Sequence, residues 1–246
     1  MSLFVSHQCG GHSTPIKENQ LQHSDGQANR GWDSSFRDFQ NTSNSVILNS
    51  LRSYYPDSSE SQITTWRRTV PQLKKEIGEV VQIDAGFTSF TAVLEYELPM
   101  ESRRADAILL LNDGVMVIEL KGKTHSTDAD IDQAHAYARD LKHYHRECHE
   151  RDVVAVLIPE RLPSAVTKQR DVFICSPDRL DALVAYLSSR NKKPPIDSER
   201  FLSGQAYKPL PSLVQAARDL FINKRPPQIR KSVADTDDAV LSLIHI

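Results

Sequence analysis

Three short apolar runs between residues 92 and 123 constrain the fold of this chain more than any other feature. They are AVLEYELPM, RRADAILLLN and VMVIELKGK, and turn-forming residues separate them at Pro99 and at Asn112-Asp113-Gly114. Short runs of branched and apolar residues bounded by turn residues are typical of β-strands joined as hairpins. Both alternating positions are largely apolar in the second and third runs, so we expect a three-stranded antiparallel meander with its later strands covered on both faces.

Helical patterns flank this meander. Residues 59–80 carry apolar side chains at steps of three and four, with Ser61 as a plausible N-cap and Pro71 as a point where the helix could kink or divide. A shorter helix is expected from Val46. A third helix should run from Asp128 to about Glu150, followed by the apolar strands VVAVLIP and DVFICSP and a helix over 178–190. The order helix, three strands, helix, strand predicts an α/β fold with a mixed central sheet flanked by helices.

The composition divides the 246 residues into three parts. Residues 1–45 are rich in Gln, Ser, Asn, His and Gly and predict a polar, disordered leader, which explains a hydrophobic content of 39%. Residues 46–190 form the predicted domain. Residues 191–246 predict a linker that contains Pro and Lys, an amphipathic helix in LPSLVQAARDLF, and a tail.

Charge and cysteine content exclude several classes of protein. The 30 Lys and Arg residues against 32 Asp and Glu residues give a net charge of −2, which excludes binding of nucleic acid by bulk positive charge. No apolar stretch approaches the roughly 20 residues of a membrane span. The three cysteines have no paired spacing, so neither a disulfide framework nor a zinc knuckle is indicated. We expect a cytoplasmic protein with no membrane contact.

The second hairpin of the meander brings charged residues together. A two-residue loop at Asp113-Gly114 would place Asp106 opposite Lys121 and diagonal to Glu119, with all three on one face of the sheet. Diagonal neighbours lie about 7 Å apart, so one divalent ion could bridge the two carboxylates. Two acids inside an apolar sheet are costly unless a cation compensates them, either a bound metal or Lys121 in a structural ion pair.

Asp106 followed by Glu119-Leu120-Lys121 at the end of a third strand resembles the signature of the PD-(D/E)XK nuclease superfamily. The predicted order of elements over 61–159 is similar to that family's restriction-endonuclease-like core, α-β-β-β-α-β. Gln133 and Tyr137, four residues apart on the following helix, resemble the Gln-x-x-x-Tyr element of some members. Taken alone, Tyr137 is more readily interpreted as a core residue on the apolar stripe of that helix.

A longer resemblance extends over residues 61–221. The segments SQITTWRRTVPQL, LEYELPMESRRADAILL, IELKGK and AYKPLPSLVQAARDLF are similar to the nuclease-like N-terminal region of Schlafen group 3-like DNA/RNA helicase proteins. In that group an ATPase module follows, which the resemblance also implies here. These residues themselves contain no GxxxxGK[ST] motif: Gly122-Lys123-Thr124 imitates its end, but Val117 stands where its first glycine is required.

The resemblance implies a metal-dependent nuclease, with DNA favoured as the substrate and RNA as a further possibility that metal chemistry alone does not separate from it. Asp106, Glu119 and the backbone carbonyl of Leu120 would hold Mg²⁺, or Mn²⁺, while Lys121 would orient a water and Gln133 would lie beside the site. Glu95 and Glu97 are equal candidates for a further ligand or base. An inactive nucleic-acid-binding or scaffolding module of a helicase-like protein is the alternative interpretation.

Other charged groups have two interpretations each. Arg103 and Arg104 could contact phosphate or form a solvated patch, and the basic residues from Arg67-Arg68 to Lys74-Lys75 could form a backbone track or a solvated helix face. A cluster near one helix end has spacings that zinc can use, although a solvent-facing cluster is the simpler interpretation. It comprises His143, His145, Cys148 and His149.

Overall fold

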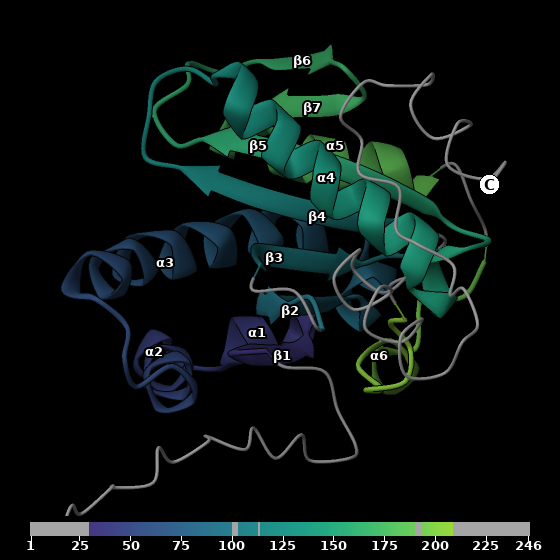
Figure 1. The fold of residues 1–246 in the computed structure, drawn as a ribbon, viewed down its shortest axis with the longest axis horizontal. Coiled ribbons are helices and arrows are strands. Elements are labelled where there is room, and N and C mark those ends of the chain that lie inside the picture. Colours follow the sequence, from purple (N-terminus) through teal and green to yellow (C-terminus); the bar gives the residue numbers. More distant parts are fainter. Residues whose placement is uncertain (1–29, 100–102, 113, 190–192, 209–246) are drawn as a thin grey trace, which may run out of the picture.

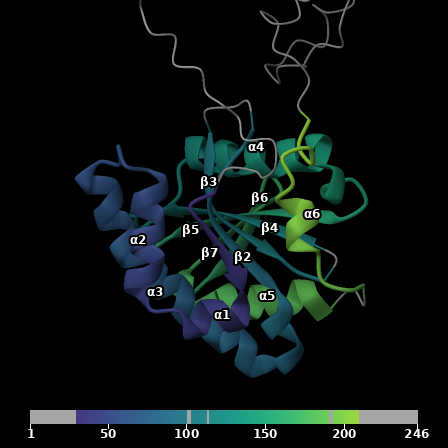
Figure 2. The same ribbon diagram turned by 90° about the horizontal axis from the view of Figure 1, so that it is seen from below.

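The fold is a sheet covered by helices on both faces (Figure 1). A computed structural model describes residues 30–99, 103–112, 114–189 and 193–208. Seven strands form one mixed sheet in the order β1-β2-β3-β4-β5-β7-β6. One helix layer contains α1, α2, α3 and α5, and α4 covers the opposite face together with α6 (Figure 2). The predicted α/β class is confirmed.

The strands are β1 (Trp32–Ser35), β2 (Thr91–Glu97), β3 (Arg104–Leu110), β4 (Gly114–Lys121), β5 (Asp152–Pro159), β6 (Val166–Gln169) and β7 (Val172–Cys175). The α-helices are α1 (Phe36–Asn41), α2 (Asn44–Tyr54), α3 (Glu60–Ile83), α4 (Asp128–Tyr144), α5 (Leu180–Ser189) and α6 (Ser198–Phe201). Within the described ranges, no helix has both the length and the apolar character that crossing a bilayer requires.

The central strands form the predicted meander. β2, β3 and β4 pair in antiparallel fashion, and α4 then carries the chain across one face so that β5 lies parallel to β4. β7 is parallel to β5, and the short edge strand β6 is antiparallel to β7. The sequence analysis does not include β6, because its four residues are all exposed and carry little apolar signal.

Helix α3 is the longest element and packs along the sheet. Its buried apolar residues follow the predicted stripe and include Trp66, Val70, Leu73 and Ile77. The N-cap is Ser59, whose side chain accepts the N–H of Gln62, rather than the predicted Ser61. Pro71 lies inside the helix, which continues to Ile83 without division.

The ordered domain begins earlier than predicted. β1 pairs with β2, and α1 follows it directly. Phe36 and Phe39, which the sequence analysis treats as isolated aromatics of a leader, are fully buried. The boundary at residue 45 is therefore wrong: two aromatic anchors order a segment whose overall composition is polar. Residues 1–29 lie outside the described residues.

The domain also continues past the predicted boundary at residue 190. The segment 193–208 packs beside α4 and contributes Ile196, Phe201, Leu202 and Tyr207 to the core on that face. The ring of Phe201 stacks on His145 with 4.0 Å between centroids. This part of the predicted linker is thus core structure. The predicted amphipathic helix and tail lie outside the described residues.

Candidate functional site

The register of the β3–β4 hairpin determines how the predicted site residues meet. The observed pairs run from Leu110↔Val115 to Ala107↔Ile118, and the N–H of Leu111 donates to the carbonyl of Gly114 at 2.9 Å. If this register is extended by one residue beyond Ala107↔Ile118, Asp106 lies opposite Glu119. The predicted pairing of Asp106 with Lys121 is wrong by two residues, because the hairpin closes at Leu111 and Gly114 rather than around Asp113-Gly114.

Glu95 on β2 and Asp106 on β3 face each other at a point where both strands reverse their side-chain alternation. The neighbouring strand pairs pack on opposite faces of the sheet. Leu94 and Ala107 face α3, whereas Tyr96 and Ala105 face α4. In a regular strand, residues two apart share a face. Glu95 has a φ of 54°, in the left-handed region that non-glycine residues adopt at a cost, and this local backbone turn accompanies the reversal.

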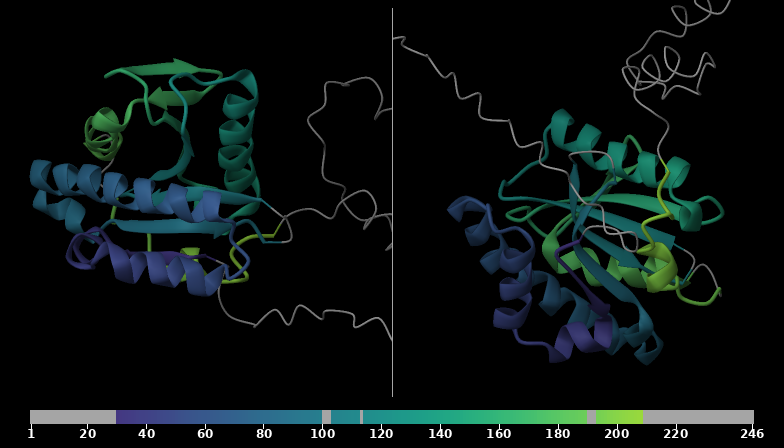
Figure 3. Two further views of the ribbon diagram at one scale, coloured as in Figure 1. Left: turned by 90° about the vertical axis from the view of Figure 1, so that its left-hand side faces the viewer. Right: turned by 60° about the horizontal axis from the view of Figure 1, so that its bottom comes forward.

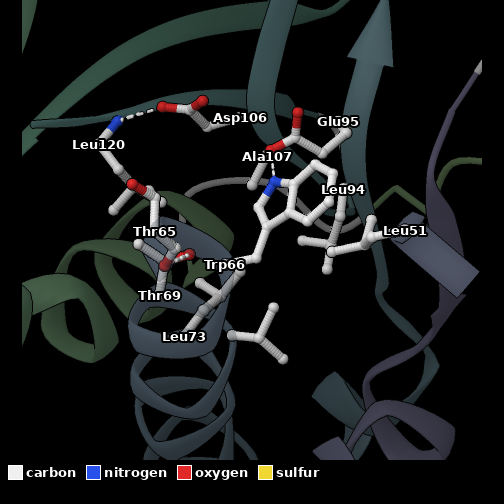
Figure 4. A pocket seen from close by; sticks show the side chains of 11 residues that line it. Leu51, Thr65, Trp66, Thr69, Leu73, Leu94, Glu95, Asp106, Ala107 and Leu120 are labelled. Atoms are coloured by element: carbon white, nitrogen blue, oxygen red, sulfur yellow. Dashed lines mark hydrogen bonds between the residues drawn. The ribbon is translucent and has the colours of Figure 1, made fainter. Parts of the chain in front are cut away.

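The reversal directs Asp106 into the seam between β3 and β4 rather than onto the α4 face. Its Oδ2 accepts the backbone N–H of Leu120 at 2.7 Å (Figure 4). The paired register ends at Ala107↔Ile118, so the carboxylate takes a place that a strand carbonyl would otherwise fill. In an extended strand the N–H and C=O of one residue point to the same side, so the carbonyl of Leu120 is also on the side of β4 that faces β3. The prediction that Asp106 shares one face with Glu119 and Lys121 is therefore wrong in this detail.

Glu119 lies on the α4 side of the seam within a closed set of hydrogen bonds. Its Oε1 accepts from Lys121 Nζ and from Gln133 Nε2, each at 2.8 Å, and Lys121 also donates to Gln133 Oε1 at 3.0 Å. Gln133 Nε2 lies 3.4 Å from the hydroxyl of Tyr137, which donates to the carbonyl of Arg104. The second carboxylate oxygen, Oε2, is buried and has no hydrogen-bond partner among the described residues.

Of the two first-strand acids, the structure places Glu95 beside Asp106. Glu95 accepts from Trp66 Nε1 at 2.6 Å (Figure 4). It also pairs with Arg104 Nε at 2.5 Å. Its backbone carbonyl accepts the hydroxyl of Tyr55, and the Arg104 guanidinium lies 4.2 Å from the centre of the Tyr55 ring. Glu97 is two residues farther along β2, opposite Arg104 in the ladder.

Burial and mutual repulsion raise the pKa values of these acids. Burial, then the charge of Asp106, raises the pKa of Glu119 to about 8 despite the hydrogen bond from Lys121. The same two causes raise the pKa of Glu95 to about 7. Desolvation raises the pKa of Asp106, although the Leu120 N–H and Lys121 oppose the shift. The group carries more negative charge than Lys121 and Arg104 neutralise, so a further cation would relieve it.

The chemistry of the donor groups suits a magnesium ion. An unpartnered buried carboxylate oxygen, a half-buried aspartate and a peptide carbonyl directed to the same seam are all hard oxygen donors. Glu95, Asp106 and Glu119 do not form a tight three-carboxylate cluster. Within the described residues, the group of acids whose ligand atoms all lie within 4.8 Å of one another is elsewhere, at Glu76, Glu79 and Asp181. Mg²⁺ commonly takes one or two carboxylates and completes its shell with water and substrate.

The predicted basic residues do not form one track. Lys74 donates to the carbonyl of Thr42, and Lys75 pairs with Glu76 and Glu79, at the end of α3 away from Trp66. Arg103 pairs with Asp140 and lies over the ring of Tyr137, while Arg104 is held by Glu95.

Exposed basic residues instead surround the ends of β4 and β5. The backbone N–H of Arg161 donates to the carbonyl of Lys123, which joins the loops after the two strands. Arg68 reaches over from α3, forms a two-point pair with Glu160, and packs so closely on Gly122 that a Cβ there would lie 3.3 Å from its Nη2. We call Arg68, Lys123 and Arg161 the basic rim.

Two members of the histidine and cysteine cluster, His145 and Cys148, are buried, whereas His143 and His149 are exposed as predicted. His145 is fully buried, and its Nε2 lies 2.9 Å from the carbonyl of Phe201. Burial lowers the pKa of His145 to about 4 and raises that of Cys148 to about 12. The solvent-facing interpretation is wrong for these two residues, because the segment 193–208 covers them. Among the described residues they belong to no group of metal-ligating side chains.

The sequence does not predict the roles that Trp66, Tyr55 and Arg104 have at this site. Trp66 belongs to the predicted apolar stripe of α3 and Tyr55 has no predicted role, yet each donates a hydrogen bond to Glu95. Arg104 is predicted as a phosphate contact or as part of a solvated patch, yet it balances the charge of Glu95. A buried aromatic side chain with a polar atom needs a hydrogen-bond partner, and this is the one sequence signal that could have indicated Trp66 and Tyr55.

Comparisons of the chain with protein-family models, with curated proteins and with solved structures find no match.

Proposed function

We propose that this chain is a metal-dependent nuclease domain that hydrolyses DNA phosphodiester bonds. The observation that carries the proposal is the convergence of Asp106, Glu119 and Lys121 at the ends of two adjacent strands, with a buried oxygen of Glu119 that has no described partner. Acids placed at such cost inside a sheet are typical of functional sites, because a fold without that function would be more stable with apolar residues there.

The order of elements supports the same proposal. α3, β2, β3, β4, α4 and β5 follow one another in the order of a restriction-endonuclease-like core, and Asp106 and the Glu119-Leu120-Lys121 segment occupy the second and third strands of that unit. We infer membership of the PD-(D/E)XK superfamily from this order and these residues. The longer resemblance supports a place before the ATPase module of a Schlafen group 3-like helicase protein.

In this proposal Asp106, Glu119 and the carbonyl of Leu120 hold Mg²⁺ or Mn²⁺. The ion, when bound, polarises the scissile phosphate and lowers the pKa of a bound water. Asp106 is held in position by the Leu120 N–H, and Glu119 by Lys121 and Gln133. These contacts fix the two carboxylates before substrate binds, which is the condition for precise placement of a reacting group.

Lys121 neutralises the negative charge that develops on the phosphoryl oxygens. Its ammonium is kept charged because the hydrogen bond and charge of Glu119 outweigh the effect of burial and raise the pKa of Lys121.

In the proposed reaction, the water oxygen forms a bond to phosphorus while one ester P–O bond breaks. This leaves a phosphate monoester and an alcohol that takes up a proton. Gln133 is a positioning residue, since it bonds Glu119 and Lys121 together.

Glu95 is the acid best placed to receive a proton near neutral pH. Its pKa of about 7 lies close to the pH at which a general base works best. Each of its oxygens already accepts one hydrogen bond, from Trp66 and from Arg104, and each retains a further lone pair. We therefore assign the base or additional-ligand role to Glu95 rather than Glu97.

The partner that suits this site is DNA held by its backbone. The basic rim lies at the strand ends where Lys121 emerges and offers Arg68, Lys123 and Arg161 to phosphates. With a net charge of −2 the chain lacks bulk attraction for nucleic acid, so these residues and the metal would provide the phosphate contacts.

Cleavage assays test the proposal directly. End-labelled single-stranded DNA, double-stranded DNA and RNA are each incubated with the chain and Mg²⁺ or Mn²⁺, with EDTA as the blank. We expect cleavage of DNA that Glu119→Gln abolishes and Glu97→Gln preserves. Binding without cleavage would favour an inactive binding or scaffolding module. Cleavage of RNA alone would change the substrate class, and cleavage by Glu119→Gln at the wild-type rate would refute this site.

A further inference from the structure

A second acidic group lies between helices α3 and α5, which pack together on one face of the sheet (Figure 2). Glu76 and Glu79 come from α3 and Asp181 from the first turn of α5, and one ligand atom of each lies within 4.8 Å of the others. Glu76 is only 3% exposed, and its Oε2 is buried without a hydrogen-bond partner among the described residues. An ionised oxygen left in this state is costly, and a bound cation is one way to satisfy it.

The charges around this group leave room for a divalent ion. Lys75 Nζ lies 3.2 Å from Oε1 of Glu76 and 2.9 Å from Oε1 of Glu79. One ammonium against three carboxylates leaves two negative charges. The nearby charges of Asp178, Asp181 and Glu76 also help to raise the pKa of the Cys175 thiol, after its burial, so their negative potential reaches the interior of this layer.

This group is separate from the candidate nuclease site. Glu76 follows Trp66, which contacts Glu95, by ten residues of the same helix, or about 15 Å along its axis. The inference below therefore does not depend on the proposed function.

We propose that Glu76, Glu79 and Asp181 bind a hard divalent cation, Ca²⁺ or Mg²⁺, that joins α3 to α5. All three donors are carboxylate oxygens, which these ions prefer, and no thiol or imidazole belongs to the group. The site combines one fixed buried ligand with two partly exposed ones. An ion reaches it from solvent past Glu79, whose side chain is 40% exposed, and then anchors on the buried oxygen of Glu76.

The test measures thermal unfolding of the full chain against CaCl₂ and, separately, MgCl₂. Every protein carries Asp106→Asn and Glu119→Gln, so that the candidate nuclease site does not contribute. On this background we expect the melting temperature to rise by about 5–10 °C when the ion exceeds its Kd a hundredfold. Isothermal titration should give one bound ion for each chain.

Adding Glu79→Gln with Asp181→Asn should abolish both signals while the apoprotein remains folded, because neither side chain is buried. A matched control removes two exposed acids of α4, Asp128→Asn with Asp132→Asn, and should keep both signals. A chain that binds neither ion, or that binds equally well without Glu79 and Asp181, overturns the proposal and leaves Glu76 as a protonated buried acid. Loss of DNA cleavage in the otherwise wild-type chain has no bearing on these readouts.

Discussion

Oδ2 of Asp106 accepts the backbone N–H of Leu120 at 2.7 Å, so one carboxylate both ends the β3–β4 ladder and lies at the candidate metal site. Two substitutions of Asp106 distinguish its role in the strand ladder from its role as a metal ligand. Asp106→Asn keeps an oxygen for the Leu120 N–H, whereas Asp106→Ala leaves that N–H without its partner.

We expect Asp106→Asn to lose DNA cleavage with little change in stability, because it removes the ligand charge alone. Asp106→Ala should lose cleavage and also unfold more easily, by about 1–3 kcal/mol, the cost of an unsatisfied buried donor. Cleavage assays and urea unfolding measure the two effects. Equal stability of the two variants would contradict the structural role given to the Leu120 contact.

The stability of the metal-free chain should fall as the pH rises from 6.5 to 8. Glu119 and Glu95 have pKa values of about 8 and about 7 in the folded chain against 4.5 as the ordinary value, so the folded state holds protons that the unfolded state has released. The stability they give is present below pH 4.5 and is lost as the pH rises through the folded values. The pKa of His145 in the folded chain is about 4, below the range of pH 6.5 to 8.

Melting temperatures in EDTA across this range measure the effect. Glu119→Gln should flatten the dependence, and so should saturating Mg²⁺ in the wild type. A wild-type melting temperature that rises between pH 6.5 and 8 would contradict the charge excess described at this site.

Lys121 and Lys123 form a matched pair, since Lys121 ends β4, Lys123 follows two residues later, and both pair with an acid. Lys121→Met should lower the cleavage rate by about a hundredfold or more, the usual effect of removing one group that stabilises transition-state charge. Lys123→Met should mainly weaken DNA binding and reduce its dependence on salt. Single-turnover rates and binding isotherms at two salt concentrations distinguish these outcomes. A larger loss of rate for Lys123→Met would exchange the two roles.

Glu95→Gln and Glu97→Gln discriminate between the two acids of β2. We expect the first to lower cleavage at least tenfold and to remove the limb near pH 7 from the pH–rate profile, because Glu95 has a pKa of about 7. The second should leave the profile unchanged. If both variants kept the limb, the titrating group would lie outside β2.

Phe201→Ala tests whether the segment after residue 192 belongs to the domain. The fully buried ring stacks on His145, so its removal should cost about 3–5 kcal/mol in denaturant unfolding. Ile83→Ala, at a side chain that is 53% exposed, serves as the control and should cost much less. A small effect of Phe201→Ala would restore the predicted boundary at residue 190.

The sequence predicts the regular parts of the fold well. Apolar runs give the three central strands, and the stripe from Trp66 to Ile77 gives α3, because burial requires these patterns wherever the elements pack. The boundaries at 45 and 190 are wrong, since a few scattered apolar residues, such as Phe36 and Phe201, anchor segments that are otherwise polar and show no sustained period.

The sequence predicts which residues gather at the candidate site, but it does not predict how they are arranged. Asp106, Glu119, Lys121 and Gln133 do come together, whereas the hairpin register and the choice between Glu95 and Glu97 depend on the backbone. The φ of 54° at Glu95 is the clearest case, because glutamate gives no signal for a left-handed residue. Distant partners such as Trp66 are likewise set by tertiary contacts alone.

The reversal of side-chain alternation at Glu95 and Asp106 has a consequence for transplanting this site. Glu95 is bonded to Trp66 of α3 and Glu119 to Gln133 of α4. These two helices cover opposite faces of the sheet (Figure 3). A grafted hairpin of β3 and β4 would carry Asp106 and Glu119, but it would lack Glu95 of β2 and the helix residues that orient the acids. The smallest unit that can be moved to another scaffold with these contacts runs from Tyr55, just before α3, to the end of α4.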